Sequence, residues 1–273
     1  MRIAVLADIH GNLPAFETVL TDLRRHAPDL LVIAGDIVVG SPDSYACWQL
    51  AQSLDCPIVR GNHERYVSHF GTEQADPLWL SEQFLPVRWA VQQFSDEERQ
   101  TIAELPLALR LLEARDLLIV HASEHSDTAS LPPHTSPHEL TAIFRDAQEQ
   151  TIARGHNHIP RTHPWSGRQI VTAGSVGLPL EGRIAAQYLL LDQVADGWEA
   201  HHQSVEYPVE QTLQRFAETN YVAQTGPMGR LFQREVATAS HYFVPFLRYY
   251  RLWLAEEPEL ALAMALERFL THF

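Results

Sequence analysis

Short apolar runs alternate with segments of helical periodicity through the first 60 residues. Three of these runs have the length of strands: 1–7 (MRIAVLA), 30–34 and 57–59. Between them, residues 16–23 and 47–54 repeat apolar side chains at helical spacing, and Asn12 with Pro14 favours a helix start. The pattern predicts two successive βαβ units, and therefore parallel strands with right-handed crossovers.

The next 130 residues or so also predict a mixture of helices and strands. Helical spacing extends from Leu78 to about Pro106, and within it Ser95 and Glu98 have the spacing of a capping box. Ser136 begins a second helical pattern, which continues to Ala147. Further strands are expected at 117–120, 151–153, 169–172 and 185–191.

The composition changes after about Ser204. Pro208 and Pro258 begin helical patterns, and residues 241–254 (HYFVPFLRYYRLWL) are dense in aromatic side chains. We expect Pro245 to kink or break that helix. The nearly all-apolar stretch 260–266 predicts a face buried against the core or a partner, and a homo-oligomer formed through these helices is one expectation. The predicted organisation is a domain over 1–204 and a helical extension over 205–273.

Composition and charge exclude several classes of function. The chain has 273 residues, 45% of them hydrophobic, and no apolar run approaches the roughly 18 residues of a membrane helix. With no signal peptide pattern either, we expect a cytoplasmic protein without a membrane partner. The formal net charge of −14 has the wrong sign for binding a nucleic-acid duplex. All 20 basic residues are arginine, which excludes Schiff-base chemistry and a Gly-Lys-Ser/Thr phosphate loop.

Redox chemistry is not expected either. The chain has two cysteines, and the apolar neighbours of Cys47 indicate a reduced thiol in the core. Histidine, in contrast, is abundant at 15 residues, and it is the commonest metal ligand in proteins. The histidines are therefore the first candidates for functional residues.

Acidic, amide and imidazole side chains directly follow five of the predicted strands. They are Asp8 and His10, then Asp36, then Asn62 and His63, then His121, and finally His156 and His158. Each alone is ordinary turn or core chemistry. In open α/β sheets, however, the loops beyond the carboxyl ends of the strands converge. Their joint occurrence at strand ends predicts a single site.

The types of these side chains indicate a metal centre. Carboxylate, amide and imidazole without thiolate suit Mn, Fe, Zn or Ni rather than a structural zinc. Seven candidate ligands exceed what one ion uses, and a bridging carboxylate would place two ions about 3.5 to 4 Å apart. Such a pair makes hydroxide from a bridging water near neutral pH, and this attacks phosphorus in line with the leaving oxygen. The expected cofactor is two divalent metal ions, with manganese favoured.

The order Asp-x-His, Gly-Asp, Gly-Asn-His-Glu, His, Gly-His-x-His resembles the calcineurin-like metallophosphoesterases. Four segments are most similar to the small bacterial and archaeal phosphodiesterase branch: ADIHGNLPAFETVL, VRGNHER, RWAVQQFSDEERQTIAELP and AGSVGLP. The resemblance covers roughly residues 1–192. It implies an α/β fold, a four-layer α/β/β/α sandwich of two mixed sheets with helices outside and metals at the strand ends.

The resemblance also implies a role for each site residue. The first metal would be held by Asp8, His10, Asp36 and His158. Asp36 would bridge to the second metal, which Asn62, His121 and His156 would complete. His63 is implied to be catalytic, as a general acid or as a cation for the transition state. Val39 and Gly40 stand where the protein serine/threonine phosphatases have Asp and Arg, so His63 would lack a carboxylate partner and the phosphate an arginine.

Several neighbouring residues are expected to have structural roles. Arg60 and Arg65 flank the Asn-His segment and are expected in surface salt bridges. Gly11 and Gly155 are expected to meet backbone requirements rather than to contact substrate. Four histidines near the C-terminus receive no functional role: His201, His202, His241 and His272.

The leading hypothesis is a dinuclear metal-dependent phosphoesterase that hydrolyses a small organic phosphodiester. A phosphomonoesterase or a dinucleoside polyphosphate hydrolase is an alternative, since the same metals could serve either reaction. A metal-binding interaction scaffold without turnover is another, because the retromer subunit with this fold works mainly by binding partners. The aromatic segment 241–254 would then be the docking face. The expected partner of the enzyme is a small phosphate ester.

Overall fold

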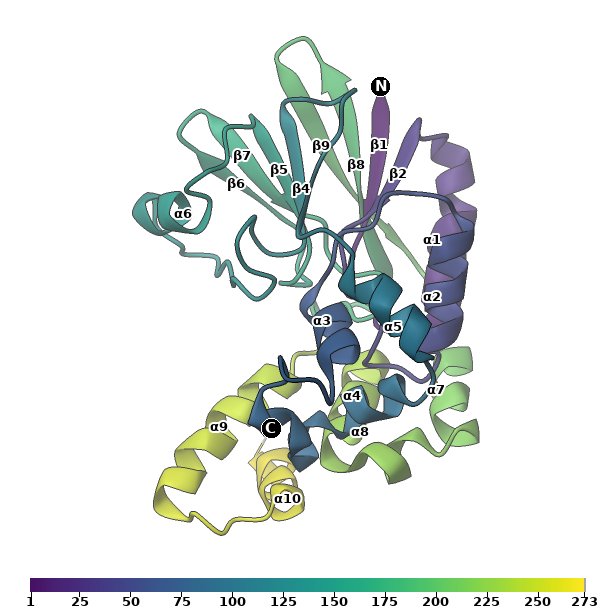
Figure 1. Cartoon of the computed structure of the whole chain (residues 1–273), viewed down its shortest axis with the longest axis vertical. Coiled ribbons are helices and arrows are strands. Elements are labelled where there is room, and N and C mark those ends of the chain that lie inside the picture. The colour runs from purple at the N-terminus through teal and green to yellow at the C-terminus, as the bar shows by residue number, and fades with distance from the viewer. Residues whose placement is uncertain (273) are drawn as a thin grey trace.

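Two mixed sheets form the centre of the computed structural model, which describes residues 1–272 (Figure 1). The first sheet has the order β2 (Leu30–Ile33), β1 (Arg2–Leu6), β8 (Ala186–Val194), β9 (Gly197–Val205). The second has the order β3 (Ala108–Arg110), β4 (Leu117–Val120), β5 (Thr151–Arg154), β7 (Arg168–Thr172), β6 (Arg161–Trp165). β1 and β2 are parallel, as are β4, β5 and β7, whereas the other pairs are antiparallel. The expected pair of mixed sheets is confirmed.

Helices cover the outer faces of both sheets. The covering helices are α1 (Leu13–His26), α2 (Ser44–Ser53) and α6 (Pro137–Ile143). Side chains alternate along β1, so that Leu6 packs with Phe16 of α1, whereas Val5 packs with Ile119 of the facing sheet. Leu140 of α6 packs on the opposite face of the second sheet. These three apolar layers give the four-layer α/β/β/α arrangement, with α6 and α1 on opposite sides of the sheets (Figure 1).

The predicted helix starts at Asn12, Ser95 and Ser136 are confirmed by their caps, whereas the helix expected from Pro258 begins later, at Leu262. The Asn12 side chain accepts from the first turn of α1 at 3.3 Å. Ser95 and Glu98 form a complete capping box on α5 (Asp96–Ala103), and Ser136 does the same with Glu139 on α6. The expected long helix before residue 106 is divided, however. Its pieces are η1 (Pro77–Leu80), η2 (Glu82–Phe84), α4 (Leu85–Val91) and α5.

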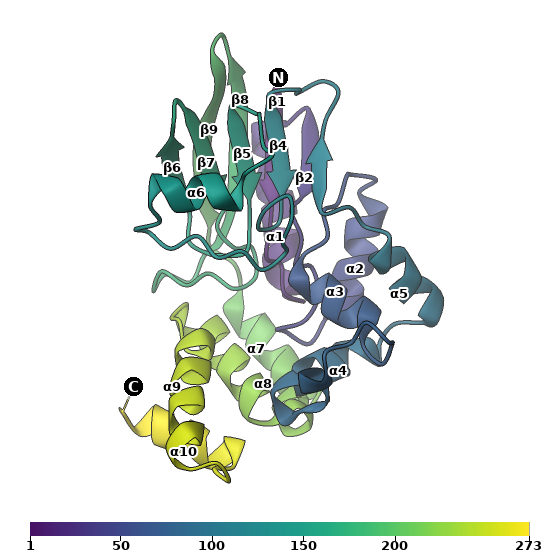
Figure 2. The ribbon, with the colours of Figure 1, turned by 60° about the vertical axis from the view of Figure 1, so that its left-hand side comes forward.

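Four further helices follow β9 and lie at one end of the sheets, next to α4 (Figures 1 and 2). They are α7 (Val209–Glu218), α8 (Tyr221–Thr238), α9 (Phe243–Glu256) and α10 (Leu262–His272). Thr212 of α7 donates to Asn12 at 2.8 Å, and Arg215 pairs with Asp43 at 2.8 Å. The expected buried face within 260–266 is confirmed, because four of its residues are buried against α8 and α9. The domain boundary at residue 204 stays a prediction.

Pro245 does not kink or break the aromatic helix, so that prediction was wrong. α9 begins at Phe243, which places Pro245 in the first turn, where backbone N–H groups have no acceptor within the helix. The kink lies in α8 instead, at Gly226 with φ 61° and ψ −145°, followed by Pro227.

The third predicted strand, over 57–59, is reduced to one parallel bridge between Ile33 and Ile58. The chain turns at Gly61 into α3 (Asn62–His69), which leaves no length for a ladder. Three strands were not expected: β3, β6 and β9. α6 also ends earlier than predicted, at Ile143. None of the helices within residues 1–272 is both long and apolar enough to cross a membrane.

Candidate metal centre and adjoining cavity

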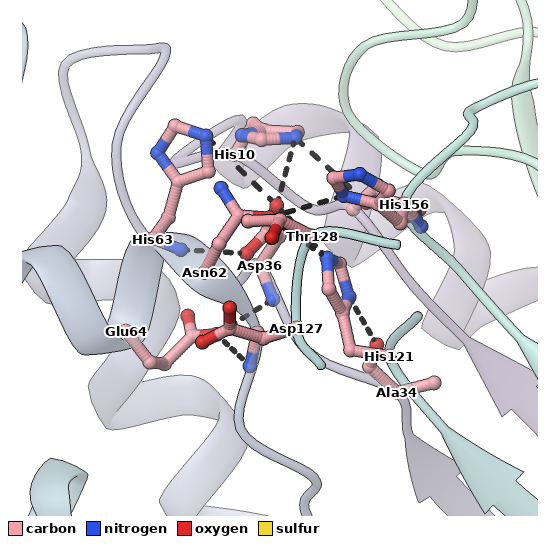
Figure 3. A network of polar contacts seen from close by, with 12 residues as sticks. His10, Ala34, Asp36, Asn62, His63, Glu64, His121, Asp127, Thr128 and His156 are labelled. Carbon is pink, nitrogen blue, oxygen red and sulfur yellow. Dashed lines mark hydrogen bonds and ion pairs between the residues drawn. The ribbon is translucent and has the colours of Figure 1, made fainter. Parts of the chain in front are cut away.

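All eight predicted site residues meet at one end of the two sheets, and Figure 3 shows six of them. Three groups each bring their ligand atoms within 4.8 Å of one another: Asp8, His10 and His158; His10, Asp36 and His63; and Asp36, His121 and His156. Asn62 Oδ1 lies 3.2 Å from His121 Nε2 and 3.1 Å from His156 Nδ1. The first and last groups match the two ligand sets that the sequence predicts, and the middle group joins them.

Backbone carbonyls fix the orientation of three imidazoles. The Nδ1 atoms of His10, His121 and His158 lie 2.8 to 2.9 Å from the carbonyl oxygens of Val39, Ala34 and Leu178, respectively. Because a carbonyl only accepts, Nδ1 of each ring carries a proton, and Nε2 is the atom left to bind a cation. These Nε2 atoms face carboxylates, with His121 Nε2 3.3 Å from Asp36 Oδ2 and His158 Nε2 3.4 Å from Asp8 Oδ1. The arrangement directs three imidazole Nε2 atoms toward one place, where bound cations would take them as ligands.

The backbone of the site is strained. Five of the seven candidate ligands have left-handed φ angles between 51° and 70°: Asp8, His10, Asp36, His156 and His158. Each such residue costs on the order of 1 to 3 kcal/mol and persists only where its surroundings hold it. Gly155 is required beside them, since a Cβ there would lie 2.8 Å from Asp8 Oδ2. The fold therefore stabilises this ligand geometry at the expense of backbone energy.

Glu64 is a supporting residue that the sequence did not reveal as such. Its fully buried carboxylate accepts from the backbone N–H groups of Asp36, Ile37 and Gly61 at 2.7 to 2.8 Å, and from Val38 at 3.3 Å (Figure 3). The interaction caps α3 and ties it to the loop after β2. The Gly-x-x-Glu spacing of a capping box at 61–64 was the available signal.

The charges of the site fit divalent cations. Asp8 and Asp36 are 0% and 2% exposed, and their ion-pair partners within residues 1–272 are all histidines. Burial alone would raise the pKa of Asp36, but the imidazoles of His121 and His63 hold it well below its usual range. Two buried carboxylates among imidazoles and one amide form a donor set that suits Mn, Fe, Zn or Ni.

His63 lies at the edge of this cluster. Its Nε2 is 3.9 Å from Asp36 Oδ2, and its ring meets that of His10 edge-on at a centroid distance of 4.9 Å. Its buried Nδ1 has no hydrogen-bond partner within residues 1–272, as expected from Val39 and Gly40 at the positions where the protein serine/threonine phosphatases have Asp and Arg. Burial lowers the pKa of His63. Asp36 is therefore the carboxylate that faces the ring, at Nε2, whereas the Nδ1 side is held by packing alone.

Two arginines beside the site differ in their roles. Arg65 forms the expected salt bridge, a double contact with Asp127 at 2.6 and 3.0 Å. Arg60 makes no ion pair within the described part of the chain and donates to the Ala103 carbonyl at 3.5 Å, so that expectation was wrong. Arg154, for which no role was predicted, is fully buried and donates to Asn157 Oδ1 at 2.6 Å. It also donates to two backbone carbonyls, and so supports the loop that carries His156 and His158.

A cavity of about 350 Å³ adjoins the cluster. One wall contains His10, Asp36, Asn62, His63, His156 and His158. A second part of the lining comes from η2, α4, α8 and α9 and includes Phe84, Pro86, Met228, Phe232, Phe243 and Leu247. His241, which received no role from the sequence, also lines the cavity. Nothing in the sequence around it indicated this, because its position depends on how α9 packs.

Comparison with known proteins agrees with this geometry. The family model of the calcineurin-like phosphoesterase superfamily domain matches residues 1–196 of this chain. An uncharacterized protein of Methanocaldococcus jannaschii is 26% identical over 213 residues, which are 70% of this chain and 82% of that protein.

Two solved structures have the same fold. A metallophosphoesterase from Sphaerobacter thermophilus superposes with a TM-score of 0.67 at 23% identity, covering 87% of this chain and 98% of the other. A hypothetical protein from Pyrococcus horikoshii superposes with a TM-score of 0.69 at 18% identity, covering 85% of this chain and 97% of the other. With most of its length matched and with this cluster of Asp, Asn and His at its strand ends, the chain belongs to the calcineurin-like phosphoesterase superfamily.

Proposed function

We propose that this protein is a dinuclear metal-dependent phosphoesterase that hydrolyses small organic phosphodiesters. The observation that carries the proposal is the pair of ligand groups, Asp8–His10–His158 and Asp36–His121–His156, joined through His10 and Asp36 at one end of a cavity. Two adjacent groups of this kind are the protein ligands that a two-metal site for phosphoryl transfer requires. A cavity of about 350 Å³ has the size of a small-molecule site.

Two divalent cations would supply Lewis acidity, lowering the pKa of water and neutralising charge on the phosphoryl oxygens. Asp8, His10, Asp36 and His158 would hold one, and Asp36, Asn62, His121 and His156 the other. The left-handed backbone positions these ligands, and backbone carbonyls hold three of the imidazoles, so that the ligands are in place before metal binds. His63 lines the same cavity and would give a proton to the leaving oxygen.

The charge of the site favours a diester over a monoester. A phosphomonoester carries up to two negative charges near neutral pH, whereas a diester carries one. The cavity lining contains no arginine within residues 1–272, and the chain has no lysine. Apart from the metals, the walls therefore offer no permanent cation to the second charge of a monoester or to further phosphates.

The test compares bis(4-nitrophenyl) phosphate with 4-nitrophenyl phosphate, each with Mn²⁺, with Zn²⁺ and with chelator. We expect turnover that chelator abolishes and a higher kcat/KM for the diester. Asp36→Ala should lose this activity while keeping its circular dichroism spectrum. Asp96→Ala is the control, since that carboxylate is fully exposed on α5. Normal turnover by Asp36→Ala would refute the site, and preference for the monoester would support the phosphomonoesterase alternative.

A further inference from the structure

The cavity continues from the metal-ligand cluster into an apolar chamber formed largely by the C-terminal helices. Met228 and Phe232 of α8 are almost fully buried, and the Phe232 ring packs against Phe243 of α9 at a centroid distance of 4.6 Å. Phe84 of η2, which also lines the cavity, contacts Tyr66, and Tyr66 in turn contacts His63, with centroid distances of 5.5 Å for both pairs. Aromatic and aliphatic side chains therefore extend directly from the predicted catalytic histidine.

α9 is anchored over this chamber by a buried carboxylate. Glu235 of α8 is 1% exposed and lines the cavity, and its Oε1 accepts from the backbone N–H groups of Tyr242 and Phe243 at 2.7 Å each. The contact caps the start of α9 and holds Phe243 against the cavity. Burial raises the pKa of Glu235 to about 7, so this side chain offers no positive charge to an anionic substituent in the chamber.

The lining therefore excludes some ligands and favours others. A polyphosphate chain or a second phosphate needs cationic or N–H donors, and no arginine within residues 1–272 lines the cavity. An uncharged apolar group, in contrast, would exchange water for contact with Met228, Phe232 and Phe243. Because the chamber is continuous with the ligand cluster, one molecule can occupy both.

We infer that the chamber between α4, α8 and α9 is the binding subsite for an uncharged alkyl or aryl substituent of the phosphoester. This inference rests on the proposed function and names its substrate class: phosphoesters with one phosphoryl group and an apolar substituent, not nucleoside polyphosphates. The C-terminal helices then determine specificity, whereas the strand-end residues perform the chemistry.

Alkylphosphonates test the subsite by binding alone. Isothermal titration of the Mn²⁺-loaded protein would compare methylphosphonate with hexylphosphonate, which share the phosphoryl group and differ in the chain. Burial of one methylene group raises affinity about fourfold. Burial of only two methylene groups of the hexyl chain would therefore make hexylphosphonate bind at least about tenfold more tightly than methylphosphonate. Equal affinities would overturn the inference.

Two variants on α9 place the same charge inside and outside the chamber. Val244 lines the cavity and Leu252 does not, yet both side chains are 58% exposed and should tolerate arginine without loss of the fold. Val244→Arg should reduce the preference for hexylphosphonate to less than about twofold, whereas Leu252→Arg should keep it. If both variants retain the preference, or both lose it, the chamber is not the subsite.

A kinetic series separates this inference from the proposed function. Methyl and hexyl 4-nitrophenyl phosphate share a leaving group: an oxygen from water bonds to phosphorus, the bond to the nitrophenyl oxygen breaks, and 4-nitrophenol and an alkyl phosphate result. Turnover with equal kcat/KM for both esters would leave the proposed function standing and overturn the subsite. No turnover with any metal, together with tighter hexylphosphonate binding, would refute the proposed function and support the subsite.

Discussion

Removing the Glu64 carboxylate should destabilise the protein far more than removing an ordinary helix cap. The carboxylate is fully buried and satisfies four backbone N–H groups, three of them in the loop that carries Asp36. Each buried donor left without a partner costs about 1 to 3 kcal/mol. Even at the low end of that range, Glu64→Ala should lose about 4 kcal/mol, a large share of the roughly 5 to 15 kcal/mol that stabilise a typical domain.

Glu98→Ala is the matched control. Glu98 occupies the same capping-box position on α5, but it lies in an exposed setting, where it bonds Ser95 and the Tyr45 side chain. Loss of an exposed cap costs about 1 kcal/mol. With a urea dependence of about 3 kcal/mol per molar, the midpoint should fall by about 1.3 M for Glu64→Ala and by about 0.3 M for Glu98→Ala.

The assay is urea unfolding followed by circular dichroism in the presence of chelator, so that metal binding does not add to stability. The two variants should keep the same slope, which shows that the midpoints report stability. Equal midpoints for Glu64→Ala and Glu98→Ala would refute the argument that Glu64 supports the loop of Asp36.

Three further predictions follow from particular residues. His63→Asn should lower kcat by about 10² to 10⁴ while the metal content measured by mass spectrometry stays unchanged, and a loss of metal would make His63 a ligand instead. Gly177→Ala should cost at least about 3 kcal/mol in thermal unfolding, because its Cβ would lie 1.8 Å from the Ile9 carbonyl oxygen. Gly71→Ala, with open space around it, should cost only about 1 kcal/mol, and equal costs would contradict the clash. Pro245→Ala should change stability by less than about 1 kcal/mol, since a larger loss would mean that the ring does more than begin α9.

Local patterns predicted the elements whose residues are buried on a regular face. β1 and α1 were found because Leu6 and Phe16 belong to periodic apolar sets that pack together. β9 was missed because, as an edge strand, it buries few side chains and reads as polar in GWEAHHQSV. β6 was missed because Pro164 and Arg161 interrupt its pattern, which an edge strand tolerates. Strands were therefore predictable from the sequence where their side chains are buried, more than where the residues have a high strand propensity.

The candidate site was predictable because the topology places strand ends together. Asp8 and Asp36 follow the parallel pair β1 and β2, and His121 and His156 follow the parallel pair β4 and β5. The cavity was not predictable in the same way. His241 and Phe243 reach it only through the packing of α9 on Glu235 of α8, a contact between segments that no periodicity connects to the site.

The most direct test of the central claim is the anomalous diffraction of crystals grown with Mn²⁺, measured at the manganese edge. The account predicts two peaks per chain, about 3.5 to 4 Å apart, with the Asp36 carboxylate between them. Asp8, His10 and His158 should surround one peak, and Asn62, His121 and His156 the other. A single peak, or peaks away from Asp36, would contradict the assignment of a dinuclear centre.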